Sequence, residues 1–292
     1  MTNDVTHGFL NLPEEFRDPK ASRISIIPVP YDLTSTFKKG ADRGPDALLN
    51  ASAQVELYDI PTRTEVHRHG ILTHDPICCD QSPEQLAELV EQRISHELQR
   101  NRFPVCLGGE HSISIGAIRA AAKHVGGNFS VLQIDAHGDT RDVYEGSPCN
   151  HACVMARARE VGSIVQVGIR AIDAEEVPAM DLDRVFFAHD ILAAADDAWM
   201  QRAVDRLAEN VYITIDLDAF DYSIMPATGT PEPGGLTWPI VNDLIARVAA
   251  SRHVVACDVV ELLPVEQLWA CDFLAAKLVH RVISMVFAHR AG

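Results

Sequence analysis

Strand-like and helix-like segments alternate along almost the whole chain, and this alternation restricts the possible folds more than any other feature. Short apolar, β-branched runs predict strands at residues 24–29, 103–107, 131–134, 164–169, 185–187, 211–215 and 254–261. Amphipathic spacing and start signals predict helices at 45–53, 83–99, from about 112, from about 151, around 199–207, at 238–250 and at 272–287. No hairpin signals join the strands, so the sequence predicts one α/β domain over residues 1–292. It should have three α/β/α layers and a doubly wound, mainly parallel sheet.

One polar segment falls outside this alternation. Residues 56–75 carry no clear strand or helix period and are expected to form a loop. Three histidines in it, His67, His69 and His74, are expected at the surface rather than at a metal site.

The composition narrows the classes of partner. A formal net charge of −16 argues against nucleic acid or an anionic membrane, because both need a basic surface. The same charge suits a cationic substrate, and it equally suits an acidic surface that only keeps the protein in solution. Seven cysteines behind an N-terminus without signal-peptide features indicate reduced thiols and a cytoplasmic protein. The apolar segment 273–288 is interrupted by charged residues, so no membrane span is expected.

Acidic and imidazole side chains follow several of the expected strands directly. Asp135, His137 and Asp139 come after an apolar run, and the two-residue period of extended chain places them on one side. Ligands of parallel sheets bind where the strands end. The polar residues expected at that edge are His111, Asp135, His137, Asp139, Asp216, Asp218 and Glu261.

So many carboxylates at one point repel one another unless cations lie among them. Aspartate and histidine ligands suit manganese, cobalt or nickel better than a thiolate zinc site, and no Cys-x-x-Cys pair is present. Two such ions about 3.5 to 4 Å apart would activate water near neutral pH. The alternatives are a solvated loop after a strand, or a phosphate-binding turn at Gly108 and Gly109, which lacks both a GxGxxG spacing and a P-loop lysine.

The motifs GGEHS, DAHGD, ITIDLDAFD with PATGTPEPGG, and DVVEL resemble, in order and spacing, the blocks of the ureohydrolase family, which includes arginase and agmatinase. The resemblance extends from about residue 24 to residue 287 and implies the arginase-like fold. It implies that one Mn²⁺ is bound by His111, Asp135, Asp139 and Asp216. The second would be bound by Asp135, His137, Asp216 and Asp218, with Asp135 and Asp216 bridging.

The same resemblance implies catalytic roles for two further residues and an oligomeric state. His151 matches the histidine that transfers protons, and Glu261 matches the acid that holds the substrate guanidinium. Family members assemble as trimers or hexamers, so a homo-oligomer is expected.

The residue after DAHGDT bears on the substrate. Arginases have an asparagine there that helps to hold the amino-acid end of arginine, whereas this chain has Arg141 and is more similar to agmatinases. We therefore expect hydrolysis of agmatine to urea and putrescine. The alternatives are N1-aminopropylagmatine, which would give spermidine, and guanidinobutyrate, arginine or formimidoylglutamate. A non-catalytic paralogue is the alternative from a different class. Tyr222, where the family usually has proline, should affect loop stiffness only.

Acidic residues are frequent in the two loops that should form the pocket rim: Asp142, Glu145, Asp173, Glu175 and Glu176. Asp173 and Glu176 are the expected substrate-binding acids, since an acidic rim favours a terminal ammonium over a carboxylate. Arg141 would repel an ammonium if it pointed into the pocket, and would be neutralised if it paired with Asp142 or Glu145.

Overall fold

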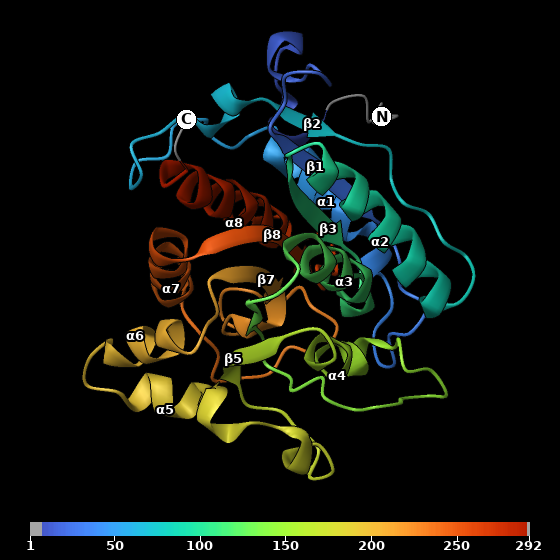
Figure 1. Ribbon diagram of the computed structural model, residues 1–292, viewed down its shortest axis with the longest axis vertical. Coiled ribbons are helices and arrows are strands. Elements are labelled where there is room, and N and C mark those ends of the chain that lie inside the picture. The colour runs from blue at the N-terminus through green and yellow to red at the C-terminus, as the bar shows by residue number, and fades with distance from the viewer. Residues whose placement is uncertain (1–7, 291–292) are drawn as a thin grey trace.

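A single eight-stranded sheet runs through the protein in the computed structural model, which describes residues 8–290 (Figure 1). The strand order is β2, β1, β3, β8, β7, β4, β5, β6, and every neighbouring pair is parallel. The strands are β1 (Ile24–Val29), β2 (Ile71–Thr73), β3 (Phe103–Gly108), β4 (Phe129–Ile134), β5 (Ser163–Ile169), β6 (Val185–Phe187), β7 (Asn210–Asp216) and β8 (His253–Val260). The expected parallel sheet is confirmed.

Helices cover both faces of the sheet, which confirms the three-layer arrangement (Figure 1). One face packs against α1 (Gly44–Ser52), α6 (Ala198–Asp205), α7 (Trp238–Ser251) and α8 (Trp269–Ala288). The other packs against α2 (Pro83–Gln99), α3 (Ser114–Val125) and α4 (Val154–Arg159). The short α5 (Ala188–Ala193) follows the edge strand β6. No helix within residues 8–290 is long and apolar enough to cross a membrane.

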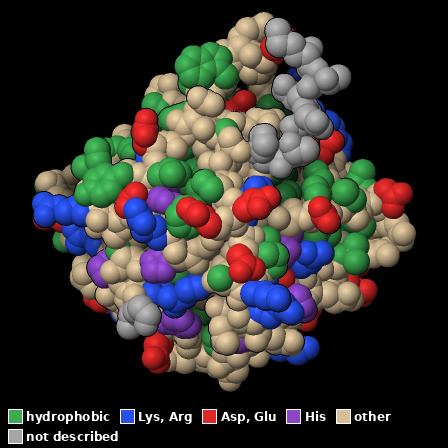
Figure 2. Space-filling view, turned by 90° about the horizontal axis from the view of Figure 1, so that it is seen from above, with side chains coloured by type: hydrophobic (Ala, Val, Ile, Leu, Met, Phe, Trp, Pro, Cys, Tyr) green, Lys and Arg blue, Asp and Glu red, His purple; other side chains and the backbone are tan. Residues whose placement is uncertain are grey.

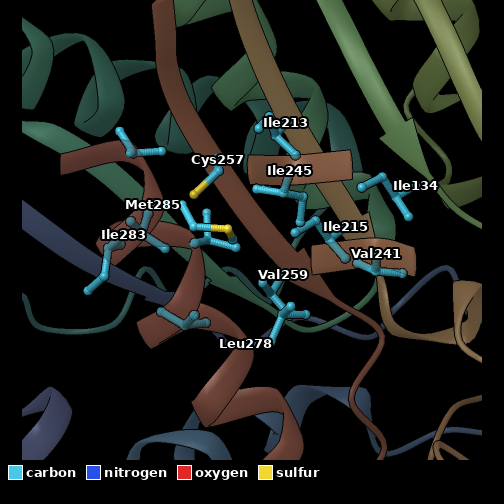
Figure 3. Close-up of a cluster of buried hydrophobic side chains, with 14 of the residues drawn as sticks. Ile134, Ile213, Ile215, Val241, Ile245, Cys257, Val259, Leu278, Ile283 and Met285 are labelled. Carbon is cyan, nitrogen blue, oxygen red and sulfur yellow. The ribbon is translucent and has the colours of Figure 1, made fainter. Parts of the chain in front are cut away.

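The central strands are buried along most of their length because both of their faces are covered. In β3 and β4 every residue is buried, as expected for strands between two helical layers. Figure 3 shows the core under α7 and α8, where side chains of β4, β7 and β8 meet those of the two helices. Its labelled residues are Ile134, Ile213, Ile215, Val241, Ile245, Cys257, Val259, Leu278, Ile283 and Met285.

The prediction of a loop over residues 56–75 is wrong at its end. Ile71–Thr73 forms the edge strand β2, which is too short and too polar at its flanks to give a two-residue period. His67 is buried rather than exposed, and its ring packs edge-on against Phe16, with the centroids 4.8 Å apart. His74, which is half-buried, lies 3.3 Å from a carboxylate oxygen of Glu97.

Charges of both signs are interspersed on the outer surface. Figure 2 shows Asp and Glu side chains alternating with Lys and Arg over the described part of one face. The net charge of −16 is therefore not gathered into one acidic patch on that face.

Glu97, at the end of α2, is a buried carboxylate whose charge is fully hydrogen-bonded. Its side chain accepts bonds from Ser25 Oγ (2.7 Å) and Arg102 Nη1 (2.7 Å), and its Oε1 lies 2.9 Å from His96 Nδ1. Burial by itself would raise the pKa, but these donors lower the pKa of Glu97 to about 2. The ionised side chain therefore stabilises the folded protein.

Replacing Glu97 with glutamine should reduce the free energy of unfolding at pH 7 by about 3 kcal/mol. Because the folded-state pKa is lowered, the contribution is complete above the ordinary pKa of 4.5 and is lost as the pH falls towards 2. Denaturant unfolding at pH 7 and pH 3 should show a difference between the two proteins that shrinks at pH 3. Glu88→Gln, at an exposed position of the same helix, is the control. A difference that is equal at both pH values would contradict this assignment.

Candidate metal centre

The four central strands β3, β8, β7 and β4 end around one cavity of about 380 Å³. The chain passes from β3 to β4 across the two strands between them, and such a crossover leaves a crevice at the carboxyl ends. His111 follows β3, Asp135 follows β4, Asp216 ends β7 and Glu261 follows β8. Six of the seven residues expected at the strand ends line this cavity: His111, His137, Asp139, Asp216, Asp218 and Glu261. The seventh, Asp135, is fully buried next to His111.

Special backbone conformations place several of these side chains. A Cβ atom at Gly109 would lie 2.0 Å from the Tyr31 carbonyl oxygen, so the turn before His111 requires glycine. Asp139 and Glu261 have φ angles of 52° and 66°, which are unusual for residues with a side chain. The Glu261 N–H donates to the Gly109 carbonyl at 2.8 Å and holds that conformation. Strain of this kind, which costs about 1 to 3 kcal/mol per residue, is concentrated at functional sites.

The first cluster surrounds the Nδ1 atom of His111. Three carboxylate oxygens lie close to it, those of Asp139 (3.0 Å), Asp135 (3.2 Å) and Asp216 (3.5 Å). Nδ1 is buried and has no hydrogen-bond partner of good geometry within residues 8–290. A buried nitrogen that faces three carboxylates without bonding well to any of them fits a metal ligand.

The opposite nitrogen of His111 is held by the sheet beneath the cluster. Nε2 lies 2.8 Å from Thr214 Oγ1, and Thr214 donates its own hydrogen to Asp258 at 2.6 Å. The Thr214 oxygen must therefore accept a hydrogen from Nε2. This contact leaves the Nδ1 lone pair of a neutral His111 directed at the carboxylates. Metal-binding histidines commonly donate the N–H of their other ring nitrogen to a neighbouring oxygen in this way.

The second cluster contains His137 and Asp218. His137 Nδ1 lies 2.9 Å from an oxygen of Asp218 and 3.8 Å from one of Asp135. Two sets of side chains have ligand atoms within 4.8 Å of one another and could each hold an ion. They are His111 with Asp135 and Asp216, and Asp135 with His137 and Asp218. Asp135 belongs to both sets, and the bridging role expected for Asp216 stays a prediction.

The charges in these clusters are poorly balanced by protein groups alone. Burial, together with Asp139 and Asp218, raises the pKa of Asp135 to about 6. Burial, with Asp218 and Asp135 as neighbours, also raises the pKa of Asp216 well above its usual range. Loss of hydration by itself would lower the pKa of the half-buried His137, yet Asp218 and Asp135 raise it to about 10. Divalent cations among these side chains would release those protons and relieve the repulsion.

Glu261 and His151 line the same cavity. Glu261 Oε1 accepts the His111 backbone N–H at 2.7 Å. Loss of hydration and the nearby Glu110 carboxylate raise the pKa of Glu261 well above its usual range, so a bound cation would be stabilised there. His151 lies in a short turn, His151–Cys153, before α4.

Arg141 lies in the cavity wall and does not contact the acids that the sequence suggested. Its guanidinium is 3.4 Å from Asp173 and 3.7 Å from Glu176, and it covers the Tyr144 ring at 4.5 Å. Asp142 instead pairs with Arg157 in the last turn of the neighbouring helix α4. Of the two alternatives that the sequence left open for Arg141, pairing with Asp142 or Glu145 is not the one observed, since neither acid lines the cavity.

Asp173 and Glu176 also line the cavity, but their carboxylates are engaged by the protein. Glu176 is 6% exposed and accepts the backbone N–H groups of Thr140 (2.9 Å) and Asp173 (3.0 Å). Through these hydrogen bonds Glu176 connects the loop after β4 to the loop after β5. Substrate binding by Asp173 and Glu176 stays a prediction.

The sequence reasoning missed cavity residues outside the acidic motifs. They are Ser35, Thr36, Phe37, Lys38, Tyr144, Ile172, Thr230 and Glu232. The segment 35–38 follows β1, so the rule that ligands bind at the ends of parallel strands could have identified it. Its residue types gave no metal-ligand signal.

Comparisons with known proteins agree with this geometry. The arginase family model matches residues 22–284. The N(1)-aminopropylagmatine ureohydrolase of Synechocystis sp. is 37% identical, with 94% of each chain covered. The agmatinase of Pyrococcus horikoshii is 31% identical, covering 92% of this chain and 93% of that protein. The crystal structure of agmatine ureohydrolase from Thermoplasma volcanium matches with a TM-score of 0.84 at 32% identity, over 92% of this chain and 91% of that one. The motif resemblance is thus confirmed, and the chain belongs to the arginase family.

Proposed function

We propose that this protein is a binuclear manganese hydrolase that releases urea from the guanidino end of a cationic polyamine. The observation that carries the proposal is the pair of His/Asp sets that share Asp135 and lie in one cavity with Glu261. Oxygen and imidazole donors fit Mn²⁺, and they would also accept Co²⁺ or Ni²⁺.

The preferred substrate in this proposal is N1-aminopropylagmatine, with agmatine as the second candidate. The Synechocystis relative named for the longer compound is 37% identical. The Pyrococcus and Thermoplasma proteins, which are named for agmatine, are 31% and 32% identical. Both substrates present a guanidinium at one end and an ammonium further along. They differ in the length of chain that the outer cavity must hold.

Each of the six metal-site residues has a distinct part in holding the ions. We assign one ion to His111, Asp135, Asp139 and Asp216, and the other to Asp135, His137, Asp216 and Asp218. When bound, the ions would lower the pKa of water and stabilise the negative charge on the oxygen that attacks the guanidinium carbon. The Asp135 carboxylate accepts hydrogen bonds from the backbone N–H of His137 (2.6 Å) and from Gln133 Nε2 (2.7 Å), which orient it.

The protein side chains orient the substrate and move protons. Glu261 holds the guanidinium by charge-assisted hydrogen bonds and so fixes its central carbon above the metal clusters. His151 takes a proton from the attacking water and gives it to the amine nitrogen as the carbon–nitrogen bond breaks. Urea and the amine are the products. The raised pKa of Glu261 suits this role, because a bound guanidinium would be a cationic partner that stabilises the ionised carboxylate.

Three broader features belong to the same proposal. Residues 1–292 form one catalytic domain, and copies of it assemble as a trimer or hexamer. The protein works in the cytoplasm, which agrees with seven cysteines that are all free thiols.

Metal removal and reloading test this function. After treatment with a chelator, urea release from both compounds should be lost, and Mn²⁺ should restore it with two ions bound per chain. Elemental analysis gives the metal count, and a colorimetric urea assay gives the activity. Full activity with one ion per chain would exclude the binuclear site. Absence of urea from every guanidino compound tested, with two ions bound, would exclude the hydrolase.

A further inference from the structure

A buried carboxylate with no part in the reaction above lies behind His151. Glu110 is 0% exposed, and its two oxygens accept four hydrogen bonds. Thr34 Oγ1 (2.5 Å) and Ser112 Oγ (2.6 Å) donate to Oε1. The Thr34 backbone N–H (2.8 Å) and Ser35 Oγ (3.1 Å) donate to Oε2. Glu110 thereby ties the loop after β1 to the turn after β3.

Thr34 connects this carboxylate to His151. Its hydroxyl oxygen lies 3.1 Å from His151 Nδ1 and accepts the His151 backbone N–H, also at 3.1 Å. A threonine hydroxyl has one hydrogen, and here that hydrogen is donated to Glu110, so its oxygen can only accept from Nδ1. This hydrogen-bond network therefore assigns the neutral imidazole of His151 its hydrogen on Nδ1, and Nε2 carries none.

The other side of the imidazole is open to the cavity. His151 lines the cavity, and no protein group within residues 8–290 forms a hydrogen bond with its Nε2 atom. The Tyr144 ring packs edge-on against the imidazole, with centroids 5.9 Å apart and planes at 86°. The contacts with Thr34 and Tyr144 thus fix the orientation of the His151 ring. The ring nitrogen without a hydrogen bond is Nε2, which lies on the side away from Thr34.

We propose that Glu110 and Thr34 are positioning residues that fix His151 as the Nδ1–H tautomer and present Nε2 as its proton-transferring atom. The catalytic part of this inference rests on the function proposed above, whereas the tautomer does not. The hydrogen-bonded groups follow one another as the Glu110 carboxylate, the Thr34 hydroxyl and the His151 imidazole. This arrangement gives His151 an orienting group, as a carboxylate does for the general base in other hydrolases.

The proton balance requires no transfer along this chain of contacts. Nε2 forms a bond to one proton of the attacking water, and the imidazolium then donates it to the departing amine nitrogen. The second proton of that water also ends on the amine, which leaves as an ammonium beside neutral urea. The Thr34 hydrogen stays on Thr34 throughout, because Glu110 accepts it in both states of the imidazole.

Thr34→Val removes the hydroxyl at nearly constant volume and tests the positioning role. In the metal-free protein, long-range ¹H–¹⁵N correlation spectra should show His151 as the Nδ1–H form, with its signals identified by their loss in His151→Asn. In Thr34→Val the signals should move towards the Nε2–H form, which imidazole prefers in water. Thr34→Ser should retain the wild-type tautomer.

Steady-state kinetics of the manganese-loaded proteins provide the second measurement. We expect kcat of Thr34→Val to fall by about 10²-fold, with KM and metal content little changed, since general acid–base catalysis contributes about 10² to 10⁴ in rate. Thr34→Ser should recover kcat to within a few-fold. Thr237→Val, at an exposed threonine whose side chain caps nothing, is the control and should behave as wild type.

The two measurements separate this inference from the proposed function. A wild-type protein that binds metal but releases no urea contradicts the function, while the spectra still decide the tautomer. An active wild type whose Thr34→Val variant keeps both its kcat and the Nδ1–H form overturns the positioning role. Failure of Thr34→Ser to restore either quantity also overturns it, because the hydroxyl would then not be the group that matters.

Discussion

Urea release by Asp135→Asn should fall by about 10³-fold or more, since the loss of metal-ion catalysis removes several kcal/mol of charge stabilisation. Asp135 is the one residue shared by both His/Asp sets, and it is fully buried between them. Asparagine keeps the volume but offers one neutral oxygen where two charged oxygens stood. The variant should therefore bind fewer than two ions per chain, as elemental analysis after gel filtration would show.

Asp142→Asn is the matched control for that change. Asp142 is in the loop that follows the same strand, but its side chain is 85% exposed and pairs with Arg157 outside the cavity. We expect its activity to stay within about twofold of wild type, because exposed ion pairs contribute little. Equal losses of activity in the two variants would mean that Asp135→Asn does not act by removing a ligand shared by two ions.

The metal clusters could be predicted from sequence because their geometry is local. Asp135, His137 and Asp139 lie within five residues of the end of β4, while Asp216 ends β7 and Asp218 follows two residues later. Parallel strands bring such ends to one edge whatever the helices between them do. Even so, sequence spacing does not determine the position of the Asp216 carboxylate closely enough to show whether it bridges both ions.

The features that the sequence did not reveal depend on contacts between distant segments. Arg141 pairs with Asp173 rather than with its neighbour Asp142, because the paths of the two loops bring Arg141 and Asp173 together. The contact between Thr34 and His151 joins residues 117 apart in sequence. The edge strand β2 pairs with the free edge of β1, and its three residues are too few to show a strand period by themselves.

The charges around the cavity mouth bear on which end group a substrate carries. Apart from Glu261 and the metal-site acids, the cavity is lined by the acids Asp173, Glu176 and Glu232 and by the cations Lys38 and Arg141. Arg141 is balanced by its contacts with Asp173 and Glu176, and its side chain stacks on Tyr144. The Lys38 ammonium lies over the Phe37 ring, 5.3 Å from its centroid, at the exposed rim. Glu232 is left as an acid without a side-chain partner within residues 8–290.

We therefore expect kcat/KM for N1-aminopropylagmatine and agmatine to exceed that for arginine and guanidinobutyrate by about 10²-fold or more. A carboxylate near one uncompensated acid, whether it replaces the ammonium as in guanidinobutyrate or accompanies it as in arginine, weakens binding by up to a few kcal/mol at the effective dielectric of a cavity. N1-aminopropylagmatine carries a second ammonium, so it should also exceed agmatine. Glu232→Gln should reduce that advantage, whereas Glu266→Gln, at an exposed position outside the cavity, should not. Preference for a carboxylate-bearing substrate would overturn the assignment and identify Lys38 or Arg141 as the end-group ligand. Preference for agmatine over the longer compound would keep the mechanism and assign the shorter substrate.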